Sequence, residues 1–172
     1  MRLLGLDPGL RRTGWGIIES DGHQLHYVAA GVICVKEHFS LAERLVQIHD
    51  GVTATIAHHR PDEAAVEAAF VSRHNPVSTL KLGQARGVIL LVPARAGLSV
   101  SEYEPNLIKK AVVGTGHATK CQVALMVYRL LLGCQRHNTD DAADALAVAI
   151  CHAHSRATAA GRKGSACCHK RR

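Results

Sequence analysis

The sequence has no long hydrophobic run, and this absence limits the classes of protein to which it can belong. Hydrophobic residues make up 47% of the 172 positions, yet no stretch approaches the roughly 18 apolar residues of a membrane-spanning helix. The first residues, 1–7, also lack the apolar length and small-residue cleavage site of a signal peptide. We therefore expect one globular domain, large enough to bury a core and without a membrane partner.

Paired cysteine motifs are absent as well. The six cysteines are scattered and form no CxxC pair, which is typical of reduced thiols in the cytoplasm. Cys151, His152 and His154 look like a ligand cluster, but two histidines two residues apart on a helix do not share a face, so we predict no zinc site there. No Ser/His/Asp constellation and no Walker phosphate loop is visible either.

Acidic residues are missing from the end of the chain. From Ser155 onward the sequence has six Lys or Arg residues and no acid, whereas residues 1–154 have 15 basic against 14 acidic residues. If four of those acids bind metal, the remaining surface is basic and favours a polyanion such as nucleic acid; charge for solubility alone is the plainer interpretation. Because the tail has little apolar content, we predict a domain over residues 1–154 and a basic, disordered tail over 155–172.

The apolar pattern predicts an α/β domain. The capping box Ser40–Glu43 opens a helix that ends before Pro61, and the strand after it should lie parallel to the first strand. The sequence therefore predicts a five-stranded mixed sheet flanked by helices. The strands are expected over residues 2–7, 13–19, 23–35, 62–67 and 98–103, and the later helices over 76–94, 105–113, 120–132 and 139–154.

Four acidic residues, far apart in the sequence, lie at the ends of apolar elements. Asp7 and Glu67 each end a strand-like run, while Asp141 and Asp144 lie three apart at the start of an alanine-rich helix and share a face. The first two then fall at the carboxyl ends of parallel neighbours. Crowded carboxylates raise one another's pKa, and a divalent cation removes this conflict. The pattern predicts a Mg²⁺-dependent phosphoryl-transfer site.

Each of these acids also has a plainer interpretation. Acids at a helix start are stabilised by the helix dipole, which accounts for Asp140 and could account for Asp141, but not for Asp144 among apolar positions. Glu67 could be the hydrated end of an edge strand. The Pro-Gly turn that follows Asp7 forms without any ligand. The indication that Asp7 is a metal ligand therefore comes from the apolar strand before it.

Residues that could contact nucleic acid lie between these acids. Phe70 falls in a predicted loop, where an aromatic ring can stack on a base or fold onto the core. Lys120 follows a glycine-containing turn at a helix N-terminus, which attracts anions. The other candidates, each of which could equally be a solvated surface residue, are Arg73, Lys81, Arg86, Lys109 and Lys110.

The helix predicted over residues 76–94 is apolar on more than one face toward its end and carries Gly83 and Gly87. A helix of this kind is expected to be buried twice, once in the core and once against a second copy of the chain.

Taken together, these residues resemble the RuvC family of Holliday junction resolvases. The segments 81–87 (KLGQARG) and 141–147 (DAADALA) are the most specific. The chain departs from the family pattern in a loop after Phe70 that is about one residue longer, in Ala68, which is polar in many members, and in its tail. The matching stretches are residues 5–9, 13–16, 67–70, 80–87, 108–116, 120–123 and 141–147.

The resemblance implies a ribonuclease H-like fold and a homodimeric, Mg²⁺-dependent endonuclease that nicks two opposed strands of a four-way DNA junction, leaving 5′-phosphate and 3′-hydroxyl ends. The family's catalytic acids fall onto the four acids named above, its junction-contacting aromatic onto Phe70, and basic positions onto Lys109 and Lys120. We expect two Mg²⁺ ions about 3.5–4 Å apart, for which Mn²⁺ would substitute. The family works with the RuvA and RuvB branch-migration proteins.

Three other functions fit parts of the pattern. A kinase-like ATPase also has an acid and glycines after a strand, but it needs two lobes and a second such loop. A relative that cuts RNA–DNA hybrids or inserts transposons would share the acids, but not the segment 81–87. An inactive junction-binding scaffold would not need all four acids.

Overall fold

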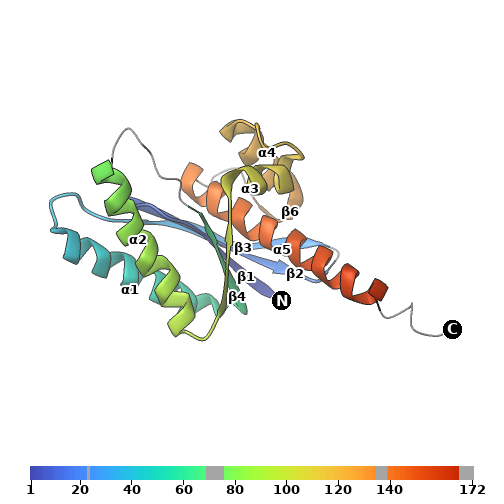
Figure 1. The fold of residues 1–172 in the computed structure, drawn as a ribbon, viewed down its shortest axis with the longest axis horizontal. Coiled ribbons are helices and arrows are strands. Elements are labelled where there is room, and N and C mark those ends of the chain that lie inside the picture. The colour runs from blue at the N-terminus through green and yellow to red at the C-terminus, as the bar shows by residue number, and fades with distance from the viewer. Residues whose placement is uncertain (23, 69–75, 135–138, 167–172) are drawn as a thin grey trace.

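The computed structural model describes residues 1–22, 24–68, 76–134 and 139–166. A six-stranded sheet forms its centre, and helices cover both faces of this sheet (Figure 1). The elements in chain order are β1 (Arg2–Asp7), β2 (Arg12–Ser20), β3 (Leu25–Cys34), α1 (Leu41–His59), β4 (Glu63–Glu67), α2 (Pro76–Arg95), β5 (Ser99–Tyr103), α3 (Pro105–Val113), α4 (Lys120–Leu130), β6 (Leu131–Leu132) and α5 (Asp140–Ala166).

The strand order places the ends of β1 and β4 side by side. The sheet runs β5-β4-β1-β2-β3-β6, with β1, β2 and β3 as an antiparallel meander. Strand β4 is parallel to β1, with Leu6 opposite Val66, and β5 is parallel to β4. The predicted parallel crossover through α1 is confirmed, and so is the capping box of that helix, in which Ser40 and Glu43 bond each other's backbone N–H groups.

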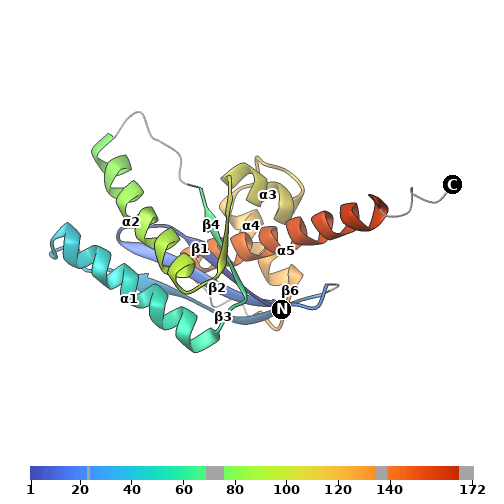
Figure 2. The same ribbon diagram turned by 60° about the horizontal axis from the view of Figure 1, so that its bottom comes forward.

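Alternation along the strands divides the core between two faces of the sheet. Leu4 and Leu6 of β1 belong to the cluster that includes residues of α1 and α2, whereas Leu3 belongs to the cluster of α3, α4 and α5. Figure 2 shows the same division, with α1 and α2 on one side of the sheet and α5 on the other. Side chains at odd-numbered positions of β1 therefore point toward α5.

Glycines let α5 lie directly on the sheet. A Cβ added at Gly5 of β1 would lie 2.1 Å from the carbonyl oxygen of Ala145, and one added at Gly14 of β2 would lie 2.0 Å from the carbonyl oxygen of Asp141. Both distances are far below van der Waals contact, so only glycine permits this approach. The start of α5 is thereby fixed against the strand that ends in Asp7.

The structure corrects the sequence prediction at two element ends. Helix α4 ends at Leu130, and Leu131–Leu132 form a sixth strand beside Leu25 and His26 of β3. A short leucine run fits a helix and a strand equally well, which is why the pattern did not separate them. The second correction concerns the last helix, which was predicted to end at His154.

Helix α5 continues to Ala166, so the prediction of a disordered tail is wrong for residues 155–166. Alanine-rich sequence extends an existing helix readily, because adding a residue to a helix costs much less free energy than starting one. Such an extension also needs no further buried face. The division of the chain into a domain and a tail at residue 154 stays a prediction. In the described part of the chain, no helix is long and apolar enough to cross a membrane.

Candidate active site

The ends of β1 and β4 direct two carboxylates to the same face of the sheet. Leu3 and Ala65 both pack in the cluster on the α5 side. Asp7 and Glu67 lie at even spacings from these residues in their strands, so their side chains point to that side as well. Because β1 and β4 are paired and parallel, the two acids meet at one edge of the sheet, as the sequence predicts.

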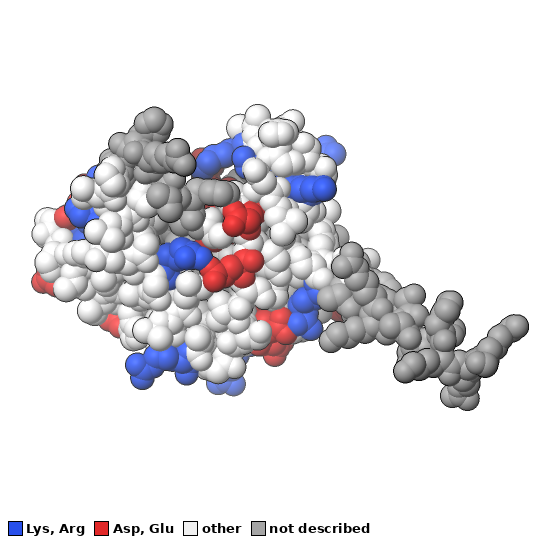
Figure 3. Space-filling model, viewed as in Figure 1, with Lys and Arg blue, Asp and Glu red and all other residues white. Residues whose placement is uncertain are grey.

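A cavity of about 270 Å³ lies at this edge and contains three of the four predicted acids. Asp7 and Glu67 come from the strands, and Asp144 comes from the first turns of α5. Lys109 of α3 and Lys120 of α4 also line it. Figure 3 shows acidic and basic side chains next to one another on the face of the molecule that is turned to the viewer. The apolar wall is made of Pro105, Ile108, Val123 and Ala147.

Burial and crowding change the protonation of the two strand acids. Burial, a hydrogen bond with Glu67 and the nearby charges of Glu67 and Asp144 raise the pKa of Asp7 from 3.8 to about 8. Burial also raises the pKa of Glu67, while its bond with Asp7 and the charges of Lys120 and Lys109 oppose this rise. A protonated Asp7 carboxyl that donates to the Glu67 carboxylate explains why their shared hydrogen bond raises the pKa of Asp7 and opposes the rise of the pKa of Glu67.

A lysine at a helix start neutralises the third acid. Lys120 Nζ donates to Asp144 Oδ2 at 3.1 Å, and this hydrogen bond raises the pKa of Lys120. The position of Lys120 is defined because α4 begins with a capping box formed by Thr119 and Gln122. The predicted phosphate contact thus lies beside the carboxylates, within the same cavity.

The fourth acid has a different partner. Asp141 does not line the carboxylate cavity, and its Oδ2 accepts a 2.6 Å hydrogen bond from Nε of Arg12, the first residue of β2. The sequence analysis did not single out Arg12. The signal for it was a pair of arginines directly after the turn that follows Asp7, but nothing in the sequence joins that pair to a residue in the last helix.

The donor set fits a divalent cation of the Mg²⁺ type. All four acids offer carboxylate oxygens, the hard ligands that Mg²⁺ prefers, and the raised pKa of Asp7 reflects a crowding of negative charge that a cation would relieve. Among the described residues, no three His, Cys, Asp or Glu side chains already form a metal-binding cluster. Asp141 and Asp144 are instead turned to Arg12 and Lys120.

Within the described residues, none of the remaining predicted contacts lines this cavity. Lys81 lines a neighbouring cavity, Arg86 forms an ion pair with Glu102, and Lys110 is exposed on α3. Phe70 and Arg73 belong to residues 69–75, which lie outside the described residues.

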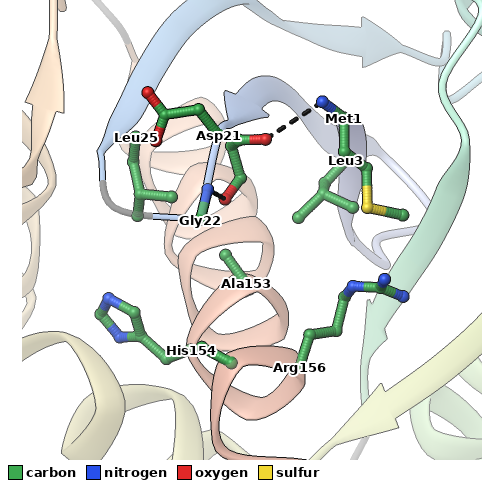
Figure 4. A pocket seen from close by; sticks show the side chains of 10 residues that line it. Met1, Leu3, Asp21, Gly22, Leu25, Ala153, His154 and Arg156 are labelled. Atoms are coloured by element: carbon green, nitrogen blue, oxygen red, sulfur yellow. Dashed lines mark hydrogen bonds between the residues drawn. The ribbon is translucent and has the colours of Figure 1, made fainter. Parts of the chain in front are cut away.

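Another cavity, of about 350 Å³, lies at the opposite end of the sheet (Figure 4). Met1 and Leu3 line it from the start of β1, Asp21 from the β2–β3 turn, and His154 and Arg156 from α5. It contains none of the four predicted carboxylates. The carboxylates that the sequence predicts for phosphoryl transfer therefore gather at the other end, where β1 and β4 finish.

His152 is engaged within the fold. Its Nδ1 lies 2.8 Å from the Tyr103 hydroxyl, and its Nε2 lies 2.9 Å from Oε2 of Glu63, which also pairs with Arg156. Both ring nitrogens thus have protein partners. This contact ties the middle of α5 to β4 and β5.

Comparisons with known proteins agree on one family. The family model described as "Crossover junction endodeoxyribonuclease RuvC" matches residues 3–152. A relative with this description from Paramagnetospirillum magneticum is 64% identical over 158 residues, which cover 92% of this chain and 94% of the relative. One from Rhodospirillum rubrum is 60% identical over 159 residues, covering 92% and 93%.

A solved structure extends this agreement to three dimensions. The structure of T. thermophilus RuvC in complex with a Holliday junction substrate matches with a TM-score of 0.85 at 33% identity, and the match covers 92% of this chain and 96% of that chain. The yeast mitochondrial Holliday junction resolvase shares the fold at 12% identity, with a TM-score of 0.62. The region matched by the family model contains all four predicted acids.

Proposed function

Because the chain belongs to the RuvC family of crossover junction endodeoxyribonucleases, we propose that its carboxylate cavity is the active site for cutting four-way DNA junctions. The family defines the reaction: hydrolysis of DNA phosphodiester bonds that resolves Holliday junctions in recombination and repair. The fold is the ribonuclease H-like fold of this family. What remains to be assigned is the part that each residue of this chain takes.

The observation that supports the site most strongly is the convergence of Asp7, Glu67 and Asp144 from three elements into one cavity with two lysines. Asp7, Glu67 and Asp144, joined by Asp141, would hold two Mg²⁺ ions. The bound ions would lower the pKa of the attacking water and stabilise charge on the phosphate and the departing 3′ oxygen, and Mn²⁺ would substitute for them.

The two lysines would bind and orient the scissile phosphate. Lys120 and Lys109 enter the cavity from two different helices, so they can contact a phosphate from two directions. Lys120 pairs with Asp144 in this structure; with Asp144 serving as a metal ligand, its ammonium would be available to neutralise the charge that develops on the phosphate oxygens. Phe70, Arg73 and Lys81 would also contact the junction DNA.

The exposed face of α2 supports a homodimer. Val77, Leu80 and Leu91 are 61%, 67% and 53% exposed, and at helical spacing they form one stripe with Gly87. A Cβ added at Gly87 would meet nothing within 4 Å, so a second helix could approach closely there. A twofold dimer would present two active sites to the two opposed strands of a junction.

The protein would act with the RuvA and RuvB branch-migration complex in the cytoplasm. Within the described residues, Cys34, Cys121 and Cys151 are free thiols, which agrees with a reducing compartment. Junction binding would depend mainly on shape and phosphate contacts, and it should therefore weaken steeply with salt.

The proposed function is tested by incubating the protein with a synthetic four-way junction, with and without Mg²⁺, and mapping the nicks. We expect paired nicks in opposed strands only with Mg²⁺, and little cutting of a linear duplex or an RNA–DNA hybrid. Asp7→Asn should bind the junction and not cut it, while Asp50→Asn, which alters an exposed acid of α1 that contacts His49, should cut normally. An active Asp7→Asn variant would refute the assignment.

A further inference from the structure

Arg12 lies between the carboxylate cavity and a second, cationic cavity. It holds Asp141, the only one of the four proposed metal ligands that does not line the carboxylate cavity. It also lines a neighbouring cavity of about 480 Å³ next to the turn that follows Asp7. The Arg12 guanidinium is thus placed to contact two anions. The first is the carboxylate of Asp141, and the second would be an anion bound in the neighbouring cavity.

The neighbouring cavity has the composition of a phosphate site. Arg11, Arg12, Arg44 and Lys81 line it, and no acid among the described residues does. Arg44 Nη2 donates to the carbonyl oxygen of Leu10 at 2.8 Å, whereas its buried Nε has no hydrogen-bond partner among the described residues. In the same part of the chain, neither Arg44 nor Lys81 forms an ion pair with a carboxylate. This excess of positive charge attracts an anion.

A phosphate of the DNA backbone suits this cavity. Guanidinium groups bind phosphate oxygens through paired N–H donors, and such contacts are shorter and stronger than neutral hydrogen bonds. The turn over residues 8–11 directly follows Asp7, so a strand with one phosphate in the carboxylate cavity can place a neighbouring phosphate against Arg12.

We propose that Arg12 is shared between Asp141 and a backbone phosphate of the junction, so that a phosphate entering the cationic cavity releases Asp141 to the carboxylate site. The inference rests on the proposed function and adds to it a dependence of metal binding on substrate binding. It makes Arg12 a positioning residue, because it acts through Asp141.

The backbone geometry restricts this exchange to side chains. The start of α5 cannot approach or leave β2 easily, because Gly14 contacts the carbonyl of Asp141 so closely. The side chains themselves have room, since that of Arg12 is 51% exposed and that of Asp141 is 30% exposed. Rotation of both side chains is then sufficient, and no element of the fold has to move.

Metal affinity without DNA gives the first test. In calorimetric titrations with Mn²⁺, Arg12→Gln should bind the ion about threefold to tenfold more tightly than wild type, because Asp141 no longer has to break its ion pair with the Arg12 guanidinium. Arg11→Gln removes the same charge from the neighbouring residue, whose partner is Glu37, and should change the affinity less than about twofold. Equal effects of the two variants would overturn the proposal.

Junction affinity without metal gives the reciprocal test. In EDTA, Asp141→Asn should bind a four-way junction more tightly than Asp140→Asn, although both remove one negative charge at the start of α5, because only the first frees Arg12. In an Arg12→Gln background, the two substitutions should have the same effect. A difference that persists in that background would contradict the shared role of Arg12.

Cleavage of the same junction by the wild-type protein with Mg²⁺ separates the two claims. Absence of cutting would refute the proposed function. Normal cutting, together with Arg12→Gln and Arg11→Gln proteins that bind Mn²⁺ equally, would refute only the exchange at Arg12. Normal cutting with tighter Mn²⁺ binding by Arg12→Gln alone supports both.

Discussion

At the scale of single residues, the cost of burying negative charge explains most properties of the site. Asp7 and Glu67 end strands whose preceding residues are fully buried, so both carboxylates lie partly out of water and next to each other. The folded protein tolerates this arrangement by protonation of Asp7 and by pairing Asp144 with Lys120. Such a site lowers the stability of the fold in exchange for function.

The first prediction concerns this cost. Asp7 keeps its proton in the folded protein up to about pH 8, whereas the unfolded chain loses it near pH 4. The buried carboxyl therefore destabilises the metal-free fold increasingly as pH rises between these values. In EDTA near pH 8, Asp7→Asn should raise the free energy of unfolding by about 1–2 kcal/mol in urea titrations.

The control for this prediction is Asp50→Asn, which should stay within about 0.5 kcal/mol of wild type. Saturating Mg²⁺ should reverse the order of Asp7→Asn and wild type, because only the wild-type site gains binding energy. An Asp7→Asn protein that is less stable than wild type in EDTA would show that the acids do not repel one another.

The second prediction compares neighbouring lysines of α3. Lys109 lines the carboxylate cavity, whereas Lys110 does not and is exposed. Lys109→Gln should lower the rate of junction cleavage roughly 10²-fold, because a donor aimed at the developing charge is lost. Lys110→Gln should leave the single-turnover rate within about twofold of wild type. Similar losses in both variants would point to general attraction of DNA instead.

At the scale of secondary-structure elements, α5 determines how the acids meet. Its start lies directly on β1 and β2 through Gly5 and Gly14. Its middle is tied to β4 and β5 through His152, which contacts Glu63 and Tyr103. Strand β4 carries both Glu63 and Glu67, so the contact at His152 also fixes the helix relative to a strand of the proposed active site.

The third prediction follows from His152. Burial lowers its pKa, although the hydrogen bond and the charge of Glu63 oppose this. The unfolded chain therefore takes up a proton near pH 6.5, before the folded protein does. The free energy of unfolding should fall as pH decreases from about 6.5 toward the lowered pKa, and His152→Gln should show a smaller fall between pH 7.5 and pH 5.5 in thermal or urea unfolding.

His154→Gln is the matched control, because His154 is exposed on the same helix. Its unfolding should keep the pH dependence of the wild-type protein. A His152→Gln variant with the full wild-type pH dependence would mean that other histidines account for the effect.

Much of this arrangement could be predicted from the sequence because it depends on local patterns. Apolar runs that end in Asp7 and Glu67, and a helix crossover between them, are sufficient to place both acids at one edge of a parallel pair. The ion pair of Arg12 with Asp141 could not be predicted, since no spacing rule joins half-exposed side chains that are distant in the sequence. The continuation of α5 was missed because low apolar content was taken as disorder, although alanine extends a helix without a core.

At the scale of the whole molecule, the charged cavities and the exposed apolar stripe of α2 lie on different parts of the surface. The carboxylate cavity and the cationic cavity lie next to each other around the turn after Asp7. The stripe of Val77, Leu80 and Leu91 lies on α2, on the other side of the sheet from α5 (Figure 2). Under the proposed function, one chain would offer one cutting site, and a second copy would be needed for paired cuts.

The fourth prediction tests this face. Leu80→Glu should shift the protein from dimer to monomer in sedimentation equilibrium, because a charge replaces an apolar side chain at the centre of the stripe. Its nicks in the two strands of a junction should then become uncoupled. Val46→Glu alters an exposed apolar residue of α1 and should remain dimeric. A dimeric Leu80→Glu protein would exclude this stripe as the interface.

The central claim is that acids distant in the sequence share divalent ions, and anomalous scattering from crystals soaked in Mn²⁺ tests it most directly. We predict an anomalous peak within coordination distance of Asp7, Glu67 and Asp144, at the carboxyl ends of β1 and β4. Crystals in which these carboxylates face apart, with no manganese between them at saturating concentration, would contradict the account.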